Sequence, residues 1–474
     1  MATAPAAART ESPAAAPLDV AARQRLPRGP RMPALAQTLA WALAPTWLMD
    51  HCARTLGDAF TVTFWPSGLK LAMFSDPEAI KTVFTAPAEV APSAAGASPV
   101  APVLGASSVL VLTGPEHMRQ RKLLLPPFHG ERMREYEDVI VEATRREMAR
   151  WPLGRPMQLQ RHTRAITLEV ILRAVFGVEA ERMGPLKEGI TNLLEPAQLL
   201  TILRAALSGP SRERPKGAIG RALDRLDVLI YEEIARRRAQ SDVESRADIL
   251  SLLLGARDED GQAMTDTELR DELVTLLLAG HETTSTSVAW AVERLVRHPD
   301  KLARLVAEID ADDGEEYMTA VVHETLRVRP VVPVVVRMLR SELEVGGYLL
   351  PAGTRVVPSI YLTNRNPQVY EQPREFRPER FLEAAPETFS WIPFGGGIRR
   401  CIGASFALLE MKLMLRTMLG ELAPRAPRGW NARLTHRDAS SPQGERIRRR
   451  AITLVPARGA SVVWERRSPG RSTG

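Results

Sequence analysis

A cysteine at position 401 lies where a run of turn-forming residues meets a helical pattern. Glycines occupy positions 395–397, and Arg399 and Arg400 directly precede the cysteine. Apolar residues recur downstream at helical spacing, so we expect Cys401 at a helix N-terminus, where free N–H groups and the helix dipole favour an anion. The two arginines add positive potential. This environment lowers the pKa of a thiol and favours the thiolate, the form that binds metals.

The spacing of residues around this cysteine distinguishes a metal ligand from an ordinary buried cysteine. Free cysteines are usually small buried hydrophobes, and glycines beside them are often only a turn. Here Phe394, Gly397, Arg399, Cys401 and Gly403 fit the pattern Phe-x-x-Gly-x-Arg-x-Cys-x-Gly. The stretch resembles the cysteine loop of the haem-thiolate monooxygenases, the cytochrome P450 superfamily, and is similar to its soluble bacterial type. The resemblance implies that Cys401 is the proximal ligand of a haem iron.

The resemblance also implies a fold and further loop contacts. The fold would be mainly α with small β-sheets, holding haem b between a long central helix and the cysteine loop. In that loop Phe394 would shield the sulfur, Arg399 would pair with a haem propionate, and Gly395 and Gly403 would contact the cofactor.

A second candidate group consists of cations. His117 and Arg121 lie one turn apart on a helix that Pro115 opens, so they share a face. A pair of this kind is often simply solvated. The resemblance instead places both against the haem propionates and makes Arg337 a third propionate partner. Charge-assisted hydrogen bonds to carboxylates suit these side chains.

A long apolar run follows a predicted capping box formed by Thr265 and Glu268. It predicts a central buried helix. Gly280 costs about 1 kcal/mol in a helix interior relative to Ala, and an acid such as Glu282 needs a partner when it is buried. We therefore expect a close approach by another group near Gly280 and a locally opened hydrogen-bond ladder.

Part of that helix, Ala279-Gly280-His281-Glu282-Thr283, resembles the oxygen-binding motif of the superfamily. The resemblance places Ala279 and Gly280 over the distal haem face. Glu282 and Thr283 would deliver the protons that dioxygen cleavage consumes. The alternative is a kinked helix whose hydroxyls bond back to its own carbonyls.

Two other pairs only look like metal motifs. His281-Glu282 and His323-Glu324 begin like the zinc protease signature His-Glu-x-x-His. Ser285 and Arg327 occupy the positions of the second histidine, so the sequence does not support zinc hydrolysis.

A third pattern concerns the scaffold. Glu324 and Arg327 are three residues apart on a predicted helix, usually the mark of a weak surface ion pair. The resemblance makes them a buried pair, joined by Arg380 of the segment Pro-Glu-Arg-Phe. This triad would fix the segment that leads to Cys401.

The substrate pocket is predicted from apolar segments. Residues 90–115 carry no charge, which favours a loop facing an apolar cavity over an ordinary surface loop. By resemblance this loop forms one pocket wall. The positions expected to contact a lipophilic substrate are Val109, Leu276, Val332 and Val334.

Length and composition limit the remaining choices. The chain has 474 residues, of which 45% are hydrophobic and 25% charged, as in an ordinary globular protein with ample core. We expect a disordered segment over residues 1–25, one catalytic domain over residues 26–465 and a frayed basic tail over residues 466–474. Residues 207–217 would join two lid helices over the substrate entrance.

Strands are expected in four places. Residues 60–65 and 70–74 should form a hairpin, residues 328–337 a strand past the haem edge, residues 343–357 further strand pairs, and residues 451–464 a C-terminal strand pair.

Charge and cysteine usage exclude other classes. The net charge is +7, but 63 basic residues are interspersed with 56 acidic ones, and no nucleic-acid-binding motif is present. The two cysteines, Cys52 and Cys401, form no disulfide framework and fit a reducing cytoplasm. The most apolar N-terminal stretch, residues 34–49, is broken by Pro45 and falls short of the roughly 20 residues of a membrane span. We expect a cytoplasmic monomer with no transmembrane anchor.

The resemblance implies a monooxygenase that uses O2 and a fatty acid, terpenoid, steroid or polyketide. Electrons would come ultimately from NAD(P)H through a ferredoxin reductase and an acidic ferredoxin, which would dock on Arg119, Lys122, Arg400 and Lys412. A peroxygenase driven by hydrogen peroxide, a redox-neutral isomerase or dehydratase, and a haem-based sensor are the alternatives.

Overall fold

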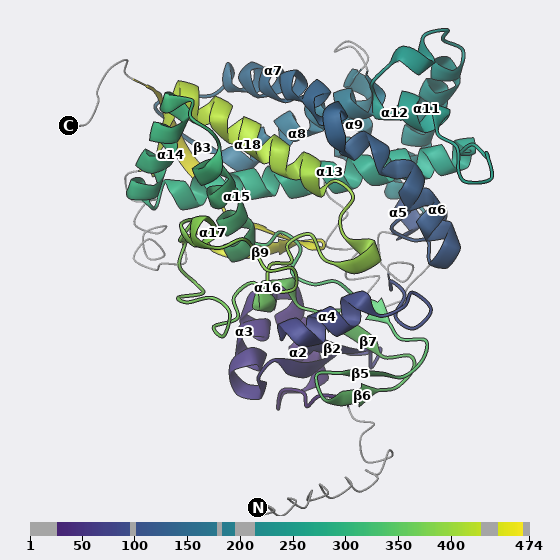
Figure 1. The fold of residues 1–474 in the computed structure, drawn as a ribbon, viewed down its shortest axis with the longest axis vertical. Helices are drawn as coiled ribbons and strands as arrows, with labels where there is room; N and C mark the ends of the chain where they lie inside the picture. Colours follow the sequence, from purple (N-terminus) through teal and green to yellow (C-terminus); the bar gives the residue numbers. More distant parts are fainter. Residues whose placement is uncertain (1–25, 95–100, 178–182, 195–213, 428–443, 468–474) are drawn as a thin grey trace, which may run out of the picture.

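The computed structural model describes residues 26–94, 101–177, 183–194, 214–427 and 444–467. Helices form most of this part, with small sheets at one end, as the sequence predicts (Figure 1). The helical layer contains α7, α8, α13 and α18, and the smaller part of the molecule contains α2, α3, α4 and the largest sheet. The segment before α18, which carries the cysteine loop, runs between these two parts.

Helices occur along the whole described part of the chain. They are α2 (Ala34–Leu43), α3 (Pro45–Leu56), α4 (Pro77–Thr85), α5 (Ala101–Leu104), α6 (Gly114–Leu124), α7 (Glu137–Met148), α8 (Leu159–Phe176), α9 (Met183–Leu194), α11 (Ala218–Arg238), α12 (Ile249–Gly255), α13 (Asp266–Leu295), α14 (Pro299–Ala311), α15 (Glu316–Val328), α16 (Ile360–Thr363), α17 (Arg380–Glu383) and α18 (Ala404–Glu421). The short 3-10 helices are η2 (Pro126–Phe128), η3 (Gly130–Tyr136), η4 (Val243–Ser245) and η5 (Gly397–Arg399).

Helix α13 is the centre of the core. It packs against α8 along its length and against α18, and most of its side chains are buried. The predicted capping box is confirmed: the Glu268 N–H donates to the Thr265 hydroxyl, and the Thr265 N–H donates to the Glu268 carboxylate. The cap satisfies N–H groups that the first turn leaves unpaired. A helix buried this deeply places its polar residues where only other elements can supply partners.

The sheets are small, and their strands come from distant parts of the chain. Strand order is β1-β2-β7-β4 in the largest sheet, β3-β11-β8 in the second, and β5-β6 and β9-β10 in two pairs. The strands are β1 (Ala59–Thr63), β2 (Lys70–Phe74), β3 (Pro156–Gln158), β4 (Arg337–Met338), β5 (Leu343–Val345), β6 (Tyr348–Leu350), β7 (Arg355–Pro358), β8 (Leu422–Arg425), β9 (Ile447–Arg450), β10 (Thr453–Pro456) and β11 (Ser461–Arg466). The antiparallel β1–β2 hairpin and the β5–β6 pair confirm two of the predicted strand regions.

Two strand predictions are wrong. In residues 328–337 only Arg337 reaches a strand, β4, because Pro330 and Pro333 have no N–H to give to a ladder. Residues 451–464 hold two strands that do not pair with each other: β10 pairs with β9, while β11 pairs with β3 and β8. Gly459 and Ala460 between them have positive φ, so the chain turns away into another sheet.

Three expectations fall partly outside the described residues. These are the N-terminal segment 1–25, most of the connection 207–217, and residues 468–474 of the basic tail. The described start of that tail is ordered: Arg466 ends β11, and Arg467 pairs with Asp310. Within the described ranges, no helix combines the length and the apolar character that crossing a membrane requires.

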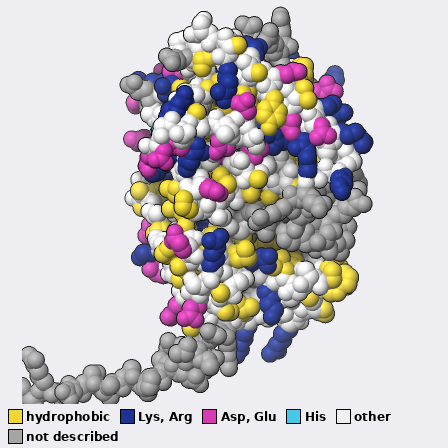
Figure 2. Space-filling view, turned by 90° about the vertical axis from the view of Figure 1, so that its right-hand side faces the viewer, with side chains coloured by type: hydrophobic (Ala, Val, Ile, Leu, Met, Phe, Trp, Pro, Cys, Tyr) yellow, Lys and Arg dark blue, Asp and Glu magenta, His cyan; other side chains and the backbone are white. Residues whose placement is uncertain are grey.

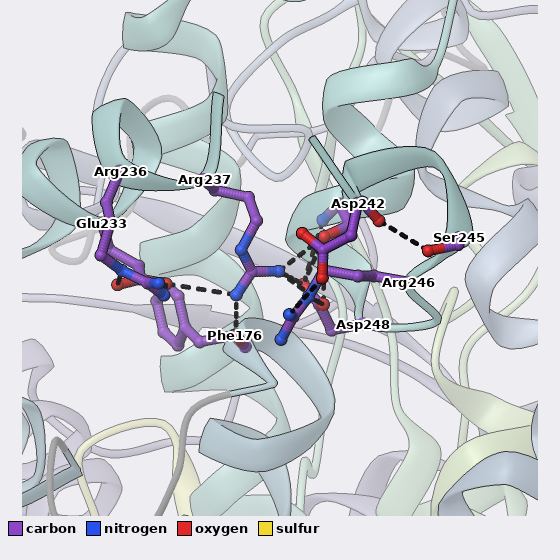
Figure 3. Close-up of polar contacts among 9 residues, drawn as sticks. Phe176, Glu233, Arg236, Arg237, Asp242, Ser245, Arg246 and Asp248 are labelled. Carbon is purple, nitrogen blue, oxygen red and sulfur yellow. Dashed lines mark hydrogen bonds and ion pairs between the residues drawn. The ribbon is translucent and has the colours of Figure 1, made fainter. Parts of the chain in front are cut away.

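A buried ion-pair network joins the helices at one end of α13 (Figure 3). Arg237 of α11 is fully buried and donates to both carboxylate oxygens of Asp248, to the Ser251 hydroxyl and to the Phe176 carbonyl. It also reaches Glu233 one turn earlier. One guanidinium therefore ties α11 to the end of α8 and to the start of α12.

Replacing Arg237 by Ala should destabilise the protein strongly, because the buried Asp248 would keep its charge with only the longer ion pair to Arg246, at 3.2 Å. We expect a loss of about 3–5 kcal/mol in the free energy of unfolding, measured by urea denaturation followed by tryptophan fluorescence. The adjacent Arg238→Ala is the matched control: its side chain is 46% exposed and pairs with an exposed Asp266, so it should cost less than about 1 kcal/mol. Equal losses for both variants would contradict this assignment.

Candidate active site

The cysteine loop turns tightly before α18. The Cys401 N–H donates to the Phe394 carbonyl at 3.0 Å, and Gly403 is the N-cap of α18. Gly397 has a positive φ of 65°, and a Cβ there would lie 2.1 Å from the Phe84 carbonyl oxygen. A Cβ on Gly396 would lie 2.3 Å from the Phe84 ring. The glycines at 396 and 397 therefore allow α4 to pack closely against the loop.

The Cys401 side chain is solvent-accessible although much of the protein surrounds it. Burial raises the pKa of its thiol, while the Gly403 N–H, Arg121 and Arg400 act in the opposite direction. The prediction of a lowered pKa is therefore wrong for the protein chain alone, because desolvation outweighs the helix N-terminus and the cations. The three opposing groups are those that stabilise a thiolate once a metal binds it.

The predicted cations meet at one place although they come from three segments. His117 and Arg121 lie on α6, Arg337 lies on β4, and Arg399 lies in η5. Burial, Arg399, Arg121 and Arg337 together lower the pKa of His117 to about 4. Burial chiefly lowers the pKa of Arg337 to about 10 and that of Arg399 to about 10. Three arginines that repel one another are thus gathered around a histidine that they keep neutral.

No carboxylate of the described chain forms an ion pair with these arginines. Arg399 donates to the carbonyls of Val109 and Leu112, and Arg337 donates only to the Val336 carbonyl. His117 Nδ1 and Arg399 Nε are buried without a partner in the described part. Buried donors of this kind are rarely left unpaired. The cluster fits a ligand that brings its own carboxylates.

One face of α13 is solvent-accessible. Leu276, Ala279 and Thr283 recur at helical spacing and are exposed or half-exposed, while most of the helix is buried. Helix α13 runs uninterrupted through Gly280, so the predicted local opening is not found. The close approach is real: a Cβ on Gly280 would lie 3.1 Å from Cδ1 of Ile171 on α8. The glycine brings two helices together.

The acid and the hydroxyl of α13 point to different partners. Glu282 forms an ion pair with Arg164 of α8, and its other oxygen lies 3.9 Å from Arg450. Burial raises the pKa of Glu282 in spite of Arg164. The Thr283 hydroxyl donates to the Ala279 carbonyl at 2.7 Å, which is the back-bonding of the alternative interpretation. Helix α13 thus contains both the ion-paired Glu282 and the back-bonded Thr283, and it continues without interruption past them.

The scaffold triad is present and buried. Arg327 donates to both oxygens of Glu324 at 2.7 and 2.8 Å, and Arg380 Nε lies 3.2 Å from the same carboxylate. Arg327 also donates to the Asn364 carbonyl, and the Asn364 side chain accepts the Ile392 N–H. Ile392 precedes the cysteine loop directly, so the triad holds the start of that loop.

The predicted substrate residues lie apart in the packing. Val109 is buried beside α13, and Leu276 is half-buried on α13. Val332 packs with the small cluster around Phe84, whereas Val334 packs with the N-terminal cluster. Val109 and Leu276 are thus both associated with α13. Val332 and Val334 lie instead in the segment before β4 and pack in two different clusters.

Three of the four cations predicted to dock a ferredoxin already have acidic partners. Arg119 pairs with Asp258 and Glu268, Lys122 with Glu259, and Lys412 with Glu315. Arg400 is exposed. The positive potential of this patch is therefore partly neutralised.

Sequence reasoning missed three supporting residues. They are Arg164, which pairs with Glu282; Asn364, which links the triad to the loop; and Glu410 of α18, which bonds Thr284 and whose pKa burial raises to about 8. An arginine or glutamate inside an apolar helix is the signal for two of them. Asn364 gives no signal, because its role depends on a turn that brings distant segments together.

Comparison with known proteins identifies the arrangement. A family model described as Cytochrome P450 matches residues 27–429. The chain belongs to the cytochrome P450 family. A Mycobacterium tuberculosis relative named cytochrome P450 137 is 41% identical over 441 residues, covering 92% of this chain and 89% of the relative. Cytochrome P450 135B1 of Mycobacterium bovis is 39% identical over 445 residues, covering 92% and 91%.

Solved P450 structures show the same fold. The cyanobacterial CYP120A1, solved with retinoic acid, has a TM-score of 0.77 at 24% identity and covers 93% of this chain and 100% of its own. The haem domain of cytochrome P450DA has a TM-score of 0.79 at 22% identity and covers 94% and 98%. The predicted fold class is confirmed.

The residues of this P450 fit haem b, the cofactor of the family. Cys401 is solvent-accessible and could ligate an iron, and the cluster of His117, Arg121, Arg337 and Arg399 could donate hydrogen bonds to two propionates. The face of α13 around Ala279 supplies an apolar wall.

Replacing Arg121 by Gln should have opposite effects on the protein with and without haem. Removing one of three mutually repelling arginines should raise the unfolding midpoint of the haem-free chain. Loss of a charge-assisted bond of about 1.5–3 kcal/mol should speed haem transfer to apomyoglobin roughly tenfold or more. The exposed Arg134→Gln should change neither rate nor midpoint. A slower haem transfer from the Arg121 variant would rule out the propionate role.

Proposed function

We propose that this P450 is a haem-thiolate monooxygenase that inserts one atom of O2 into a lipophilic substrate by hydroxylation or epoxidation. The observation that carries the proposal is the solvent-accessible Cys401, which would face the cofactor cavity, beside arginines that form no ion pair with an acid of the described chain. Membership of the P450 family supports it. Fatty acids, terpenoids, steroids and polyketides share the chemistry that the uncharged residues 101–113 would accept.

Haem supplies the activation of dioxygen and the oxidation of the substrate when it is bound. The chain supplies the rest. Cys401 would ligate the iron, and the Gly403 N–H, Arg121 and Arg400 would stabilise its negative charge. The cation cluster would orient the propionates, and the triad behind the loop keeps the sulfur in register.

Proton supply would come from α13. Glu282 has a raised pKa and is held by Arg164, so it can carry a proton when that ion pair opens. Thr283 is its neighbour on the cavity side, and its hydroxyl oxygen remains able to accept while it donates to Ala279. A carboxyl followed by a hydroxyl is a short route for moving protons from outside the pocket to its interior.

Electrons would come from a ferredoxin and its reductase, and ultimately from NAD(P)H. Arg400 and the edges of the paired cations offer a modest positive surface near Cys401. We place the monomeric enzyme in the cytoplasm, where a reducing environment preserves both the buried Cys52 and Cys401.

Replacing Cys401 by Ser should abolish the thiolate signature of the haem. The reduced, carbon monoxide-treated protein should show the Soret band of thiolate-ligated haem, and the C401S variant should lose it while still binding haem. The buried Cys52→Ser is the control and should keep the band. If C401S retained the thiolate band, both the ligand and the proposed function would be wrong.

Replacing Thr283 by Ala should separate electron use from product formation. With a lipophilic compound that shifts the haem spin state as substrate, product formation should fall by roughly 10²-fold, and the electrons should appear as hydrogen peroxide. Ser287→Ala, which removes a hydroxyl one turn away that bonds the Thr283 carbonyl, is the control. Unchanged coupling in T283A would favour a sensor, and turnover without reductant would favour an isomerase or a peroxygenase.

A further inference from the structure

The uncharged loop between α5 and α6 is fastened to the first turns of α13. The Ser107 N–H donates to Asp271 at 2.9 Å, and the Thr275 hydroxyl donates to the Ser108 hydroxyl at 2.7 Å. Gly105 packs so closely on Asp271 that a Cβ would lie 2.1 Å from its carboxylate oxygen. Residues 105–113 are therefore held by side chains of α13, although no charged residue of the loop itself takes part.

One residue of this loop, Val109, is held on both sides of its Cα. The Val109 N–H donates to Oε1 of Glu272 at 2.7 Å, and the Val109 carbonyl accepts from Nη1 of Arg399 at 2.8 Å. Arg399 also reaches the Leu112 carbonyl. The acid on α13 and the arginine of the cysteine loop thus grip the same residue, which we expect to contact substrate.

Glu272 stands on the cavity side of α13. It lies four residues before Leu276, which is followed at helical spacing by Ala279 and Thr283. It is fully buried, and its Oε2 has no partner within the described chain. A buried carboxyl with half its bonding capacity unused is costly. Its one side-chain hydrogen bond among the described residues is with the Val109 N–H, so its structural role is to hold the loop.

We propose that Glu272 is a positioning residue that latches the loop of residues 105–113 to α13 and thereby sets the shape of the substrate pocket. Through the Val109 peptide the latch is linked to Arg399 and so to the cofactor. This inference rests on the proposed function for the identity of the pocket, and its test needs no turnover.

The charges around Glu272 make the latch sensitive to pH. Burial, with Asp271 and Glu268 adding repulsion, raises the pKa of Glu272 to about 8, although the Val109 N–H opposes the rise. Asp271 is itself paired with Arg270, which also bonds Asp227 of α11.

The other facing charges come from α6 and the cysteine loop. Arg119 and Gln120 of α6 bond Glu268, and Arg399 lies across the Val109 peptide. None of these cations bonds Glu272 directly, so no cation in contact offsets its burial.

The sign of the pH effect follows from linkage. In an opened loop Glu272 would be hydrated, and its pKa would fall towards the ordinary value of about 4.5. The latched form then binds the proton more tightly, so raising the pH towards 8 favours opening, and above pH 8 the effect stops. The ratio of the open to the latched form changes by at most tenfold per pH unit.

Hydrogen–deuterium exchange of the haem-loaded full chain tests the latch directly. Exchange of the peptide covering residues 105–113, corrected for the intrinsic pH dependence, should rise in the wild type from pH 6 to pH 8, by up to about 100-fold. Glu272→Gln keeps an oxygen that can accept the Val109 N–H but cannot ionise, so its loop should stay protected at both pH values. Glu272→Leu removes the acceptor, and exchange should be at least about tenfold faster throughout.

A second measurement asks whether the loop shapes the pocket. Binding of 4-phenylimidazole, a haem ligand with an apolar ring, followed by its spectral shift at pH 7.5, should weaken at least about threefold in E272L and be retained in E272Q. Glu410→Gln is the matched control: Glu410 is an equally buried acid with a pKa also raised to about 8, but it bonds Thr284 and does not touch the loop. In the E410Q variant, deuterium exchange of residues 105–113 should keep the pH dependence of the wild type.

Three results would overturn the latch. One is loop exchange in E272Q that follows pH as in the wild type. Another is faster exchange in E272L spread evenly over the whole chain, which would make Glu272 a general core residue. The third is unchanged 4-phenylimidazole affinity in E272L despite a released loop. Because these readouts use spectra and exchange, they are independent of whether the P450 transfers oxygen.

Discussion

The bidentate pair between Arg327 and Glu324 is the interaction on which the site depends. Its guanidinium uses the remaining N–H groups for the carbonyls of Asn364, Pro373 and Glu375, three points on the long connection that leads to the cysteine loop. A connection of that kind has few backbone hydrogen bonds of its own, so a buried arginine with five donors organises it. Removing one partner would strand a buried charge, which is far more costly than losing a surface pair. The position of the Cys401 sulfur therefore depends on the Arg327–Glu324 ion pair, which lies behind the cysteine loop.

A second constraint runs in the opposite direction. Behind the loop Arg327 and Arg380 pair with Glu324, while His117, Arg121, Arg337 and Arg399 gather without an ion pair to an acid of the described chain. The first arrangement stabilises the chain by itself; the second stores repulsion that only a ligand with negative charge can relieve. The same protein therefore gains stability from its scaffold and gives some of it up at the site that binds the cofactor. Folding and haem binding are coupled through this cluster, because the cost of gathering the cations is recovered when the carboxylates arrive.

Local patterns made part of this predictable from sequence. The capping box at Thr265 and the β1–β2 hairpin depend on neighbours in the chain, and the structure has them as expected. The motif around Cys401 and the triad followed from family resemblance, which carries contacts that no local pattern could give. The separation of β11 from β10 depended on a turn at Gly459 and Ala460, and the partner of Glu282 came from α8, more than a hundred residues earlier in the chain. The pKa of Cys401 could not be read from adjacent arginines, since the burial that outweighs them is a property of the whole fold.

Acids on α13 show how a buried helix can organise what surrounds it. Glu272 and Glu282 lie ten residues apart, near opposite ends of the stripe of Leu276, Ala279 and Thr283. Neither acid finds a partner on its own helix, so each must draw one from outside: the Val109 N–H in one case and Arg164 in the other. Both acquire raised pKa values for the same reason, desolvation, but their partners differ, and so do their consequences. An acid paired with a cation can exchange protons when the pair opens, whereas an acid paired with a backbone amide fixes a loop. On this view the helix divides proton supply and pocket shape between two carboxyls of similar burial, and the element that each one contacts decides its role.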